Sequence, residues 1–210
     1  GRTPKRLLSF GLFRFGPKNE QVLWKSGVLV NGQLKPLQTE LIHEEVTSTW
    51  LREEPGGDLI PDPNKPGAYT WVKTVKYNRE FYEGGPLARM LMNGKYQGGT
   101  GTMDRIVARS LETYLIADLV EKWLYKLKQG PPPLNQKKIP VRRSVTSLTD
   151  AMRGPLLHQA RISGEQITEY NIITPTVWNF APKDRFGKHG PAENALLSTQ
   201  IPPQVPAKTI

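Results

Sequence analysis

The sequence predicts an α+β fold in which one long, central, buried helix is accompanied by shorter helices and small peripheral β-sheets. Apolar residues recur every four positions over residues 102–128, and at 1.5 Å per residue this helix would be about 40 Å long. The stripe is wide, so we expect the helix to lie in the middle of a larger body. Nineteen prolines and nineteen glycines break the rest of the 210 residues into short elements. The stripe consists of Val107, Leu111, Leu115, Leu119, Trp123 and Leu127.

Three segments have the pattern of β-strands. Residues 22–35 are predicted to form a hairpin, because Asn31-Gly32 is a dipeptide that accepts positive φ at both central turn positions. Residues 71–79 alternate enough to form a short strand. Residues 155–178 are predicted to contain two strands joined at Ser163-Gly164.

The remaining segments are predicted to be short helices and linkers. Residues 40–52 show weak helical periodicity, and Gly85-Pro86 should open a helix, with proline in the first turn where its missing N–H costs nothing. Residues 134–147 are interpreted as a basic linker, and residues 192–198 as a short helix. Residues 53–70 are rich in Pro, Gly and Asp and should form a surface loop.

Composition excludes several kinds of site. The chain has no cysteine, so it can form neither a disulfide nor a thiolate metal site by itself. No run of eighteen apolar residues occurs, so no membrane-spanning helix is predicted. The net charge of +10 permits an anionic partner, but no RNA-binding signature with interleaved aromatic residues is present, and no nucleic acid partner is expected.

Three segments carry a resemblance to a known family. They are GGPLARML at 84–91 with the long helix that follows, LTDAMRGPLLH at 148–158, and YNIITPTVWNFAPKDRFGKHGPAENALLST at 170–199. In order and spacing they resemble the large subunit of nickel-iron hydrogenases, over its C-terminal half. The resemblance implies one partial large-subunit domain over 1–210, with a strand- and loop-rich part at 1–83, core helices at 84–133 and an active-site-pocket segment at 134–210.

The resemblance implies an activity and a cofactor. Family members oxidise hydrogen or reduce protons at a nickel-iron centre that carries carbon monoxide and cyanide ligands. Two cysteine pairs hold that centre, and both fall outside this chain, so no residue here is expected to bind the metals directly. We therefore expect complementary large-subunit segments that carry the cysteine pairs, and an iron-sulfur small subunit, as partners.

The second segment contains the predicted catalytic residues. The resemblance places Arg153 over the open face between nickel and iron, and a guanidinium offers a rigid fork of donors there. Asp150 takes the place of a family glutamate and could pair with Arg153 or relay protons. Met152 replaces the usual proline, which loosens the backbone beside Arg153. His158 matches a family histidine, suited to a proton path or to a buried hydrogen-bond network.

The third segment contains the predicted cofactor-binding residues. Pro175 and Thr176 match the family's V-P-S/T, where a hydroxyl and a backbone N–H bind a cyanide. The main-chain carbonyl of Ile172 falls where the family offers one oxygen to a magnesium ion, although a single carbonyl cannot hold magnesium. Lys73 weakly resembles a lysine beside that ion.

Two other functions remain open at this level. A non-catalytic structural or interaction protein that has kept the fold and lost the metal would also explain the absence of cysteine. A basic nucleic-acid binder is favoured by charge alone, and salt-dependent binding to arbitrary nucleic acid would distinguish it. The cellular compartment is left open.

Overall fold

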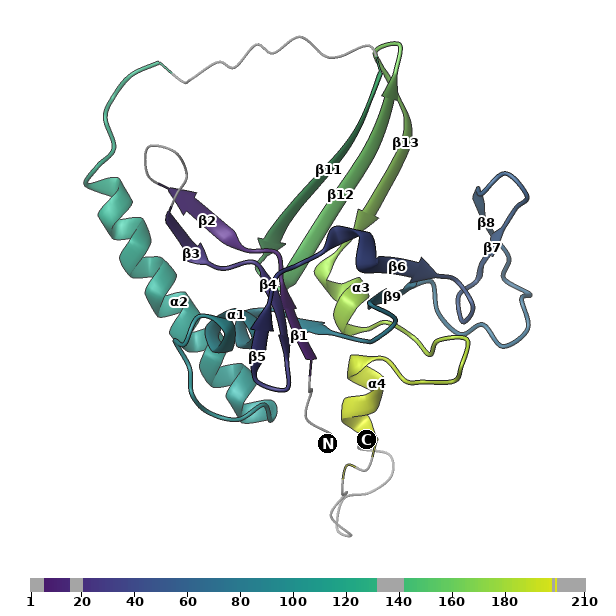
Figure 1. Ribbon diagram of the computed structural model, residues 1–210, viewed down its shortest axis with the longest axis horizontal. Coiled ribbons are helices and arrows are strands. Elements are labelled where there is room, and N and C mark those ends of the chain that lie inside the picture. Colours follow the sequence, from purple (N-terminus) through teal and green to yellow (C-terminus); the bar gives the residue numbers. More distant parts are fainter. Residues whose placement is uncertain (1–5, 16–20, 132–141, 198, 200–210) are drawn as a thin grey trace.

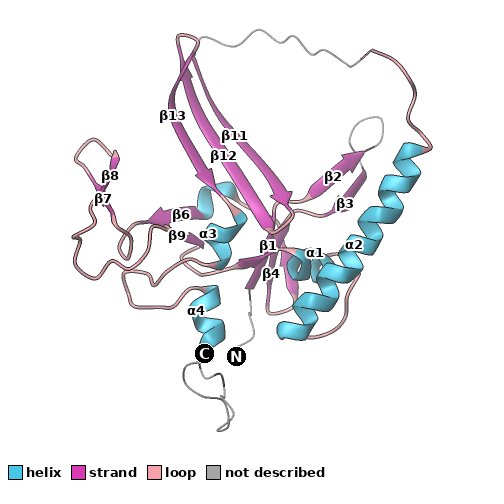
Figure 2. Ribbon diagram, turned by 180° about the vertical axis from the view of Figure 1, so that it is seen from behind, coloured by secondary structure: helices cyan, strands magenta, loops and turns pink. Residues whose placement is uncertain are grey.

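The computed structural model describes residues 6–15, 21–131, 142–197 and 199. Figures 1 and 2 show one long helix at one edge, several small sheets, and short helices between them. The mixed fold predicted from the sequence, one long helix with small sheets, is confirmed. Within the described residues, no helix is long and apolar enough to cross a membrane.

A four-stranded sheet lies at the centre, in the order β10-β1-β4-β5. Strand β1 (Arg6–Ser9) runs antiparallel to β4 (Gly27–Val30) and parallel to β10 (Glu83–Gly84). Strand β5 (Gln33–Lys35) follows β4 through Asn31 and Gly32, whose φ values of 49° and 79° confirm the predicted turn. Strand β3 (Gln21–Trp24) pairs instead with β2 (Leu12–Phe15).

The helix suggested at 40–52 is wrong. A short 3-10 turn (Thr39–Leu41) leads into strand β6 (Ile42–Glu45), which pairs with β9 (Thr74–Tyr77). Strands β7 (Leu51–Glu53) and β8 (Leu59–Pro61) form a small hairpin, of which only β8 and the end of β7 lie in the region predicted as a loop. Pairing with a strand 29 to 35 positions away outweighs weak local periodicity, and the predicted strand at 71–79 supplies that partner.

A three-stranded sheet contains β11 (Arg142–Ala151), β12 (Gly154–Ser163) and β13 (Gln166–Ile173), all antiparallel. The two predicted strands are confirmed, and Gly164 and Glu165 both take positive φ in the turn between them. The predicted basic linker is corrected over 142–147, which belongs to β11, while its first part lies outside the described residues. In Figure 1 this sheet projects from the body, with the β11–β12 turn at its inner end.

The long helix is confirmed as α2 (Thr102–Leu124), but the described residues do not bury it, and its burial inside a larger body stays a prediction. Only Ala108 and Glu112 of α2 are buried, and Leu111 and Leu124 are 39% and 63% exposed. The physical reason is that α2 packs mainly on α1 (Pro86–Met92), a helix of seven residues that covers only a short length of it.

The core fixes the elements around the β11–β12 turn. Leu8, Val75, Leu157 and Trp178 belong to one buried cluster that joins the central sheet, β9, β12 and α3 (Pro175–Asn179). The Trp178 ring meets Phe10 edge to face at 5.9 Å. Helix α4 (Pro191–Leu196) completes this side of the molecule.

Candidate functional site

The candidate site is built around the tight turn between β11 and β12. Ala151 faces Gly154 in the register, so Met152 and Arg153 form the connection. Gly154 has a φ of +134°, and a Cβ atom there would lie 2.9 Å from the backbone nitrogen of Gly85. The turn therefore lies directly against the start of α1, and only glycine allows that approach.

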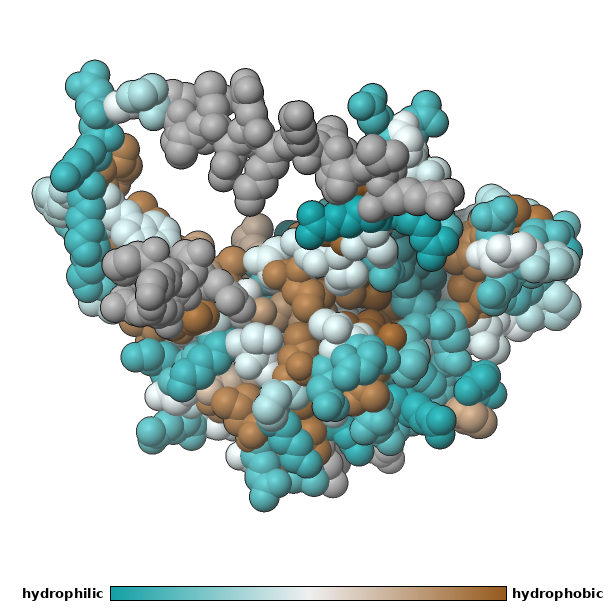
Figure 3. All heavy atoms as spheres, turned by 45° about the horizontal axis from the view of Figure 1, so that its top comes forward, coloured by the Kyte–Doolittle hydropathy of each residue, from teal (hydrophilic) through white to brown (hydrophobic). Residues whose placement is uncertain are grey.

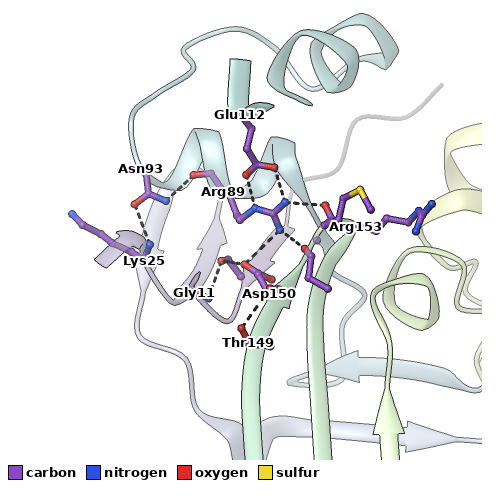
Figure 4. Close-up of polar contacts among 12 residues, drawn as sticks. Gly11, Lys25, Arg89, Asn93, Glu112, Thr149, Asp150 and Arg153 are labelled. Atoms are coloured by element: carbon purple, nitrogen blue, oxygen red, sulfur yellow. Dashed lines mark hydrogen bonds and ion pairs between the residues drawn. The ribbon is translucent and has the colours of Figure 1, made fainter. Parts of the chain in front are cut away.

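The Arg153 side chain is exposed, and in Figure 4 it points away from the contacts among Arg89, Glu112 and Asp150. It lines a hollow of about 390 Å³, which we call the Arg153 pocket. The pocket lies between α1, α2, α3 and α4. Its lining residues are Glu83, Gly84, Pro86, Leu87, Arg105, Arg109, Arg153, Thr176, Asn179, Phe180, Pro191, Ala192 and Ala195.

The pocket carries excess positive charge. Arg105 is held by Glu83 through two hydrogen bonds of 2.7 Å, which raise the pKa of Arg105 above its usual value. Arg109 and Arg153 form no ion pair with any described residue. One acidic residue thus faces three arginines, so the pocket favours an anionic occupant.

Thr176 lies in the same pocket as Arg153, as the resemblance implies. Strand β13 ends at Ile173, and α3 begins two residues later. Pro175 is the first residue of that helix. Pro175 is buried and Thr176 is exposed towards the pocket. The proline fixes φ at the start of α3, and Thr176, the next residue, lines the pocket.

Asp150 lies next to this turn but points elsewhere. Its carboxylate is 2% exposed, accepts a hydrogen bond from Ser9 Oγ, and lies 3.7 Å from Arg89 Nη1. Burial raises the pKa of Asp150, and the positive charge of Arg89 opposes that rise. The expected pairing with Arg153 is therefore replaced by a pairing with Arg89, as Figure 4 shows.

His158 and Ile172 lie away from the Arg153 pocket. They face each other across β12 and β13, and His158 Nδ1 is 2.6 Å from the Tyr170 hydroxyl. The side chains of Leu157 and Ile173, next to them in sequence, point into the core, so His158 and Ile172 occupy the opposite face of the sheet. Their catalytic and magnesium-binding roles stay predictions.

Lys73 forms a small polar network beside β13. Its Nζ lies close to Glu44 Oε1 and donates to Asn171 Oδ1 at 2.9 Å. Asn171 in turn donates to Glu44. Asn171 is the residue before Ile172. Lys73, whose resemblance to the family lysine is weak, therefore contacts strand β13.

Several residues of the site were not identified from the sequence. Arg89, Arg105 and Arg109 come from helices α1 and α2, where arginine is common on solvated surfaces. Arg89 gave one usable signal in the sequence, because it stands among the apolar residues of the G-P-L-A-R segment. In the structure it is only 1% exposed. Asn179, which lines the pocket, gave no signal beyond its place in the third segment.

The residues present do not fit the role of ligands to nickel or iron. Such a centre requires soft thiolate ligands, and the chain has no cysteine. Among the described residues, no group of three or more His, Asp or Glu side chains could hold a metal ion. The pocket instead offers N–H and O–H donors, which recognise anions and not cations.

Comparison with known proteins identifies a group of relatives. The family described as nickel-dependent hydrogenase matches residues 1–100 and 92–208. The periplasmic NiFeSe hydrogenase large subunit of Desulfomicrobium baculatum is 31% identical over 94% of this chain and 45% of its own length. The hydrogenase-1 large chain of Escherichia coli is 26% identical over 96% of this chain and 44% of its own length. The chain thus spans less than half the length of these relatives.

Solved structures of hydrogenases show the same similarity. The H2-activated NiFeSe hydrogenase of Desulfomicrobium baculatum superposes with a TM-score of 0.83 and 32% identity, over 92% of this chain and 46% of that chain. The reduced Ni-Fe-Se hydrogenase of Desulfovibrio vulgaris Hildenborough has the same TM-score, with 30% identity over 92% of this chain and 47% of that chain.

Proposed function

Because this chain belongs to the nickel-dependent hydrogenase family, we propose that it forms part of the catalytic large subunit of a nickel-iron hydrogenase. In that role it contributes to reversible hydrogen oxidation and proton reduction. Its own contribution is the protein pocket that surrounds the metal centre, while the metals are held by cysteines of other segments.

The Arg153 pocket is the single observation that carries this proposal. The resemblance assigns Arg153 and Thr176 to the same metal centre, and the two residues, from different motifs, line one hollow. Arg109 adds a second guanidinium to the lining of the pocket. Fixed N–H and O–H donors in a confined space stabilise anionic ligands such as cyanide more strongly than water does.

The proposed cofactor is a nickel-iron centre with carbon monoxide and cyanide ligands, which splits hydrogen heterolytically when bound. This chain supplies none of its thiolates, so its residues act around the centre. Arg153 would donate hydrogen bonds to ligands of the centre, and Thr176 would donate to a cyanide. A magnesium ion near the carbonyl of Ile172 would need its remaining ligands from other segments.

Asp150 and His158 are proposed to serve the movement of protons. Neither residue lines the Arg153 pocket. Asp150 lies three residues before Arg153, on the other side of the turn, where burial raises its pKa above the usual value. His158 is joined to the Tyr170 hydroxyl on the outer face of the sheet, and this pair offers both a donor and an acceptor.

Complementary large-subunit segments and an iron-sulfur small subunit are the proposed partners. Much apolar side-chain surface of α2 is exposed, including Ile106, Leu111 and Leu124. Figure 3 shows further apolar surface gathered across the middle of the visible face. Exposed apolar surface of this kind is typical of a protein interface. From the family resemblance we also propose that the chain divides at residues 84 and 134 into a strand- and loop-rich part, core helices and an active-site-pocket segment.

The experiment is the substitution Arg153→Lys in an assembled enzyme that contains this chain. Lysine keeps the charge but loses the planar fork, so we expect hydrogen uptake to fall by about 10²–10³-fold. Nickel and iron contents should stay unchanged. The matched control is Arg161→Lys, because Arg161 lies on β12, the strand that begins just after Arg153, is exposed, and pairs with Glu169 outside the pocket. Unchanged hydrogen uptake in Arg153→Lys would refute the proposed role.

A non-catalytic structural or interaction protein is the second candidate, and the absence of cysteine favours it if no cysteine-bearing partner chain exists. The two functions differ in what purifies with the chain. A catalytic complex should contain nickel and iron in a stoichiometric ratio to this chain, together with cysteine-bearing partners. A metal-free complex without hydrogen uptake would favour the structural function.

A further inference from the structure

We propose that Arg89 is a positioning residue that holds the β11–β12 turn and thereby aims Arg153 into its pocket. The inference deepens the proposed function and rests on the role given there to Arg153. Arg89 does not line the pocket, so it acts only through the turn.

The guanidinium of Arg89 joins three elements. Its Nε and Nη2 donate to the two carboxylate oxygens of Glu112 on α2, at 2.6 and 2.7 Å. Nη1 donates to the Ala151 carbonyl at 3.1 Å, and Nη2 donates to the Met152 carbonyl at 3.0 Å. Asp150 Oδ2 lies 3.7 Å from Nη1. Figure 4 shows these contacts converging on one side chain.

The contacts hold consecutive residues of the turn. Arg89 binds the carbonyls of the two residues that precede Arg153, and Asn179 Nδ2 donates to the Arg153 carbonyl at 3.4 Å from the other side. The backbone is thus held on both sides of the point where the Arg153 side chain leaves it. Met152 occupies the place of a family proline, so the contacts of Arg89 supply rigidity that the local sequence lacks.

The charge and burial of Arg89 suit this function. The side chain is 1% exposed, and Glu112 balances its charge through a bidentate pair, which is the strongest geometry for such a bond. The pair leaves N–H groups directed at the two carbonyls. A lysine at position 89 would keep the charge, but its single ammonium lacks the planar fork needed to bind the carboxylate and both carbonyls in this geometry.

The first test measures the turn itself. In the assembled enzyme, hydrogen exchange of the peptide over residues 148–158 is followed by mass spectrometry for wild type, Arg89→Lys and Glu112→Gln. Glu112→Gln weakens the contact between α1 and α2 but leaves the bonds from Arg89 to the turn possible. We expect exchange at least about tenfold faster in Arg89→Lys, and clearly slower exchange in Glu112→Gln than in Arg89→Lys. Equal exchange rates in the two variants would overturn the proposal.

The second test is a double-mutant cycle on hydrogen uptake. We expect Arg89→Lys to lower turnover on the order of 10²-fold with normal metal content, because small misplacements of a catalytic group cost that much. In the Arg153→Lys background, the same change should lower turnover by less than about threefold. Losses that simply multiply would show that Arg89 acts independently of Arg153, and would overturn the proposal.

The two tests separate failure of this inference from failure of the proposed function. If Arg153→Lys leaves hydrogen uptake unchanged, the proposed function fails, while the exchange measurement still reports whether Arg89 holds the turn. If Arg89→Lys prevents assembly, the same exchange comparison is made on the full chain. There, faster exchange in Arg89→Lys than in Glu112→Gln supports the inference, and equal exchange overturns it.

Discussion

Replacement of Gly84 by alanine tests how tightly the site is packed. Gly84 pairs with Leu8 of β1, and its N–H binds the side chain of Asn179. A Cβ atom at Gly84 would lie 2.1 Å from Cδ of Pro155, which is about 1.3 Å inside the ordinary contact limit of 3.4 Å. Pro155 is the second residue of β12 and is fully buried, so its ring has no free space into which to move.

The expected cost follows from this overlap. Gly84 does not adopt positive φ, so alanine brings no backbone strain, and the effect is steric. Overpacking of a dense core costs about 1–3 kcal/mol, and an overlap against a rigid ring belongs at the upper end. With a urea m-value of about 2–3 kcal/mol/M, the unfolding midpoint of Gly84→Ala should fall by about 1 M.

Urea unfolding of the full chain, followed by tryptophan fluorescence, measures this change, because Trp24 and Trp178 are almost fully buried. Gly56→Ala is the matched control: it lies in the β7–β8 loop, lacks positive φ, and a Cβ atom there meets nothing within 4 Å. Equal midpoints for Gly84→Ala and Gly56→Ala would refute the packing described around the turn.

Three further predictions concern buried charge and metal. Lys76 is 6% exposed, and its Nζ lies 3.0 Å from carboxylate oxygens of both Glu45 and Asp184. Lys76→Met should therefore destabilise the fold by about 3–5 kcal/mol in urea unfolding, because both carboxylates lose this partner charge. Lys122→Met, on the exposed face of α2, should not destabilise it. Burial raises the pKa of Asp184, but hydrogen bonds from backbone N–H groups and from Lys76 outweigh it and lower that pKa below its usual value. The resulting stability is therefore present above about pH 4 and lost as the pH falls further; Asp184→Asn should flatten the acid limb of a stability-against-pH curve, and an unchanged limb would contradict this. Finally, the chain alone should bind less than stoichiometric nickel or iron, and one nickel per chain by elemental analysis would contradict the absence of suitable ligands.

Local chemistry explains which features could be predicted from the sequence. The turns at Asn31-Gly32 and Ser163-Gly164 were predictable, because positive φ is a property of single residues. The apolar period gave α2, and proline gave the start of α1, whereas α3 was not predicted. The resemblance placed Arg153 and Thr176 in one site, and these two residues line one pocket.

Contacts between distant segments decided the rest. Strand β6 forms because β9 lies beside it, and the burial of α2 depends on what packs against it, so neither could be derived from a local pattern. Asp150 pairs with Arg89, 61 positions earlier, and not with Arg153, three positions later, because the tight turn directs the two side chains apart. The sequence thus pointed to Arg153 and Thr176, since residue types and motifs are local, but not to the other residues of the pocket. Only the tertiary structure decided which guanidinium is buried as support and which is left free in the pocket, because that depends on the packing of α1 and α2 against the turn.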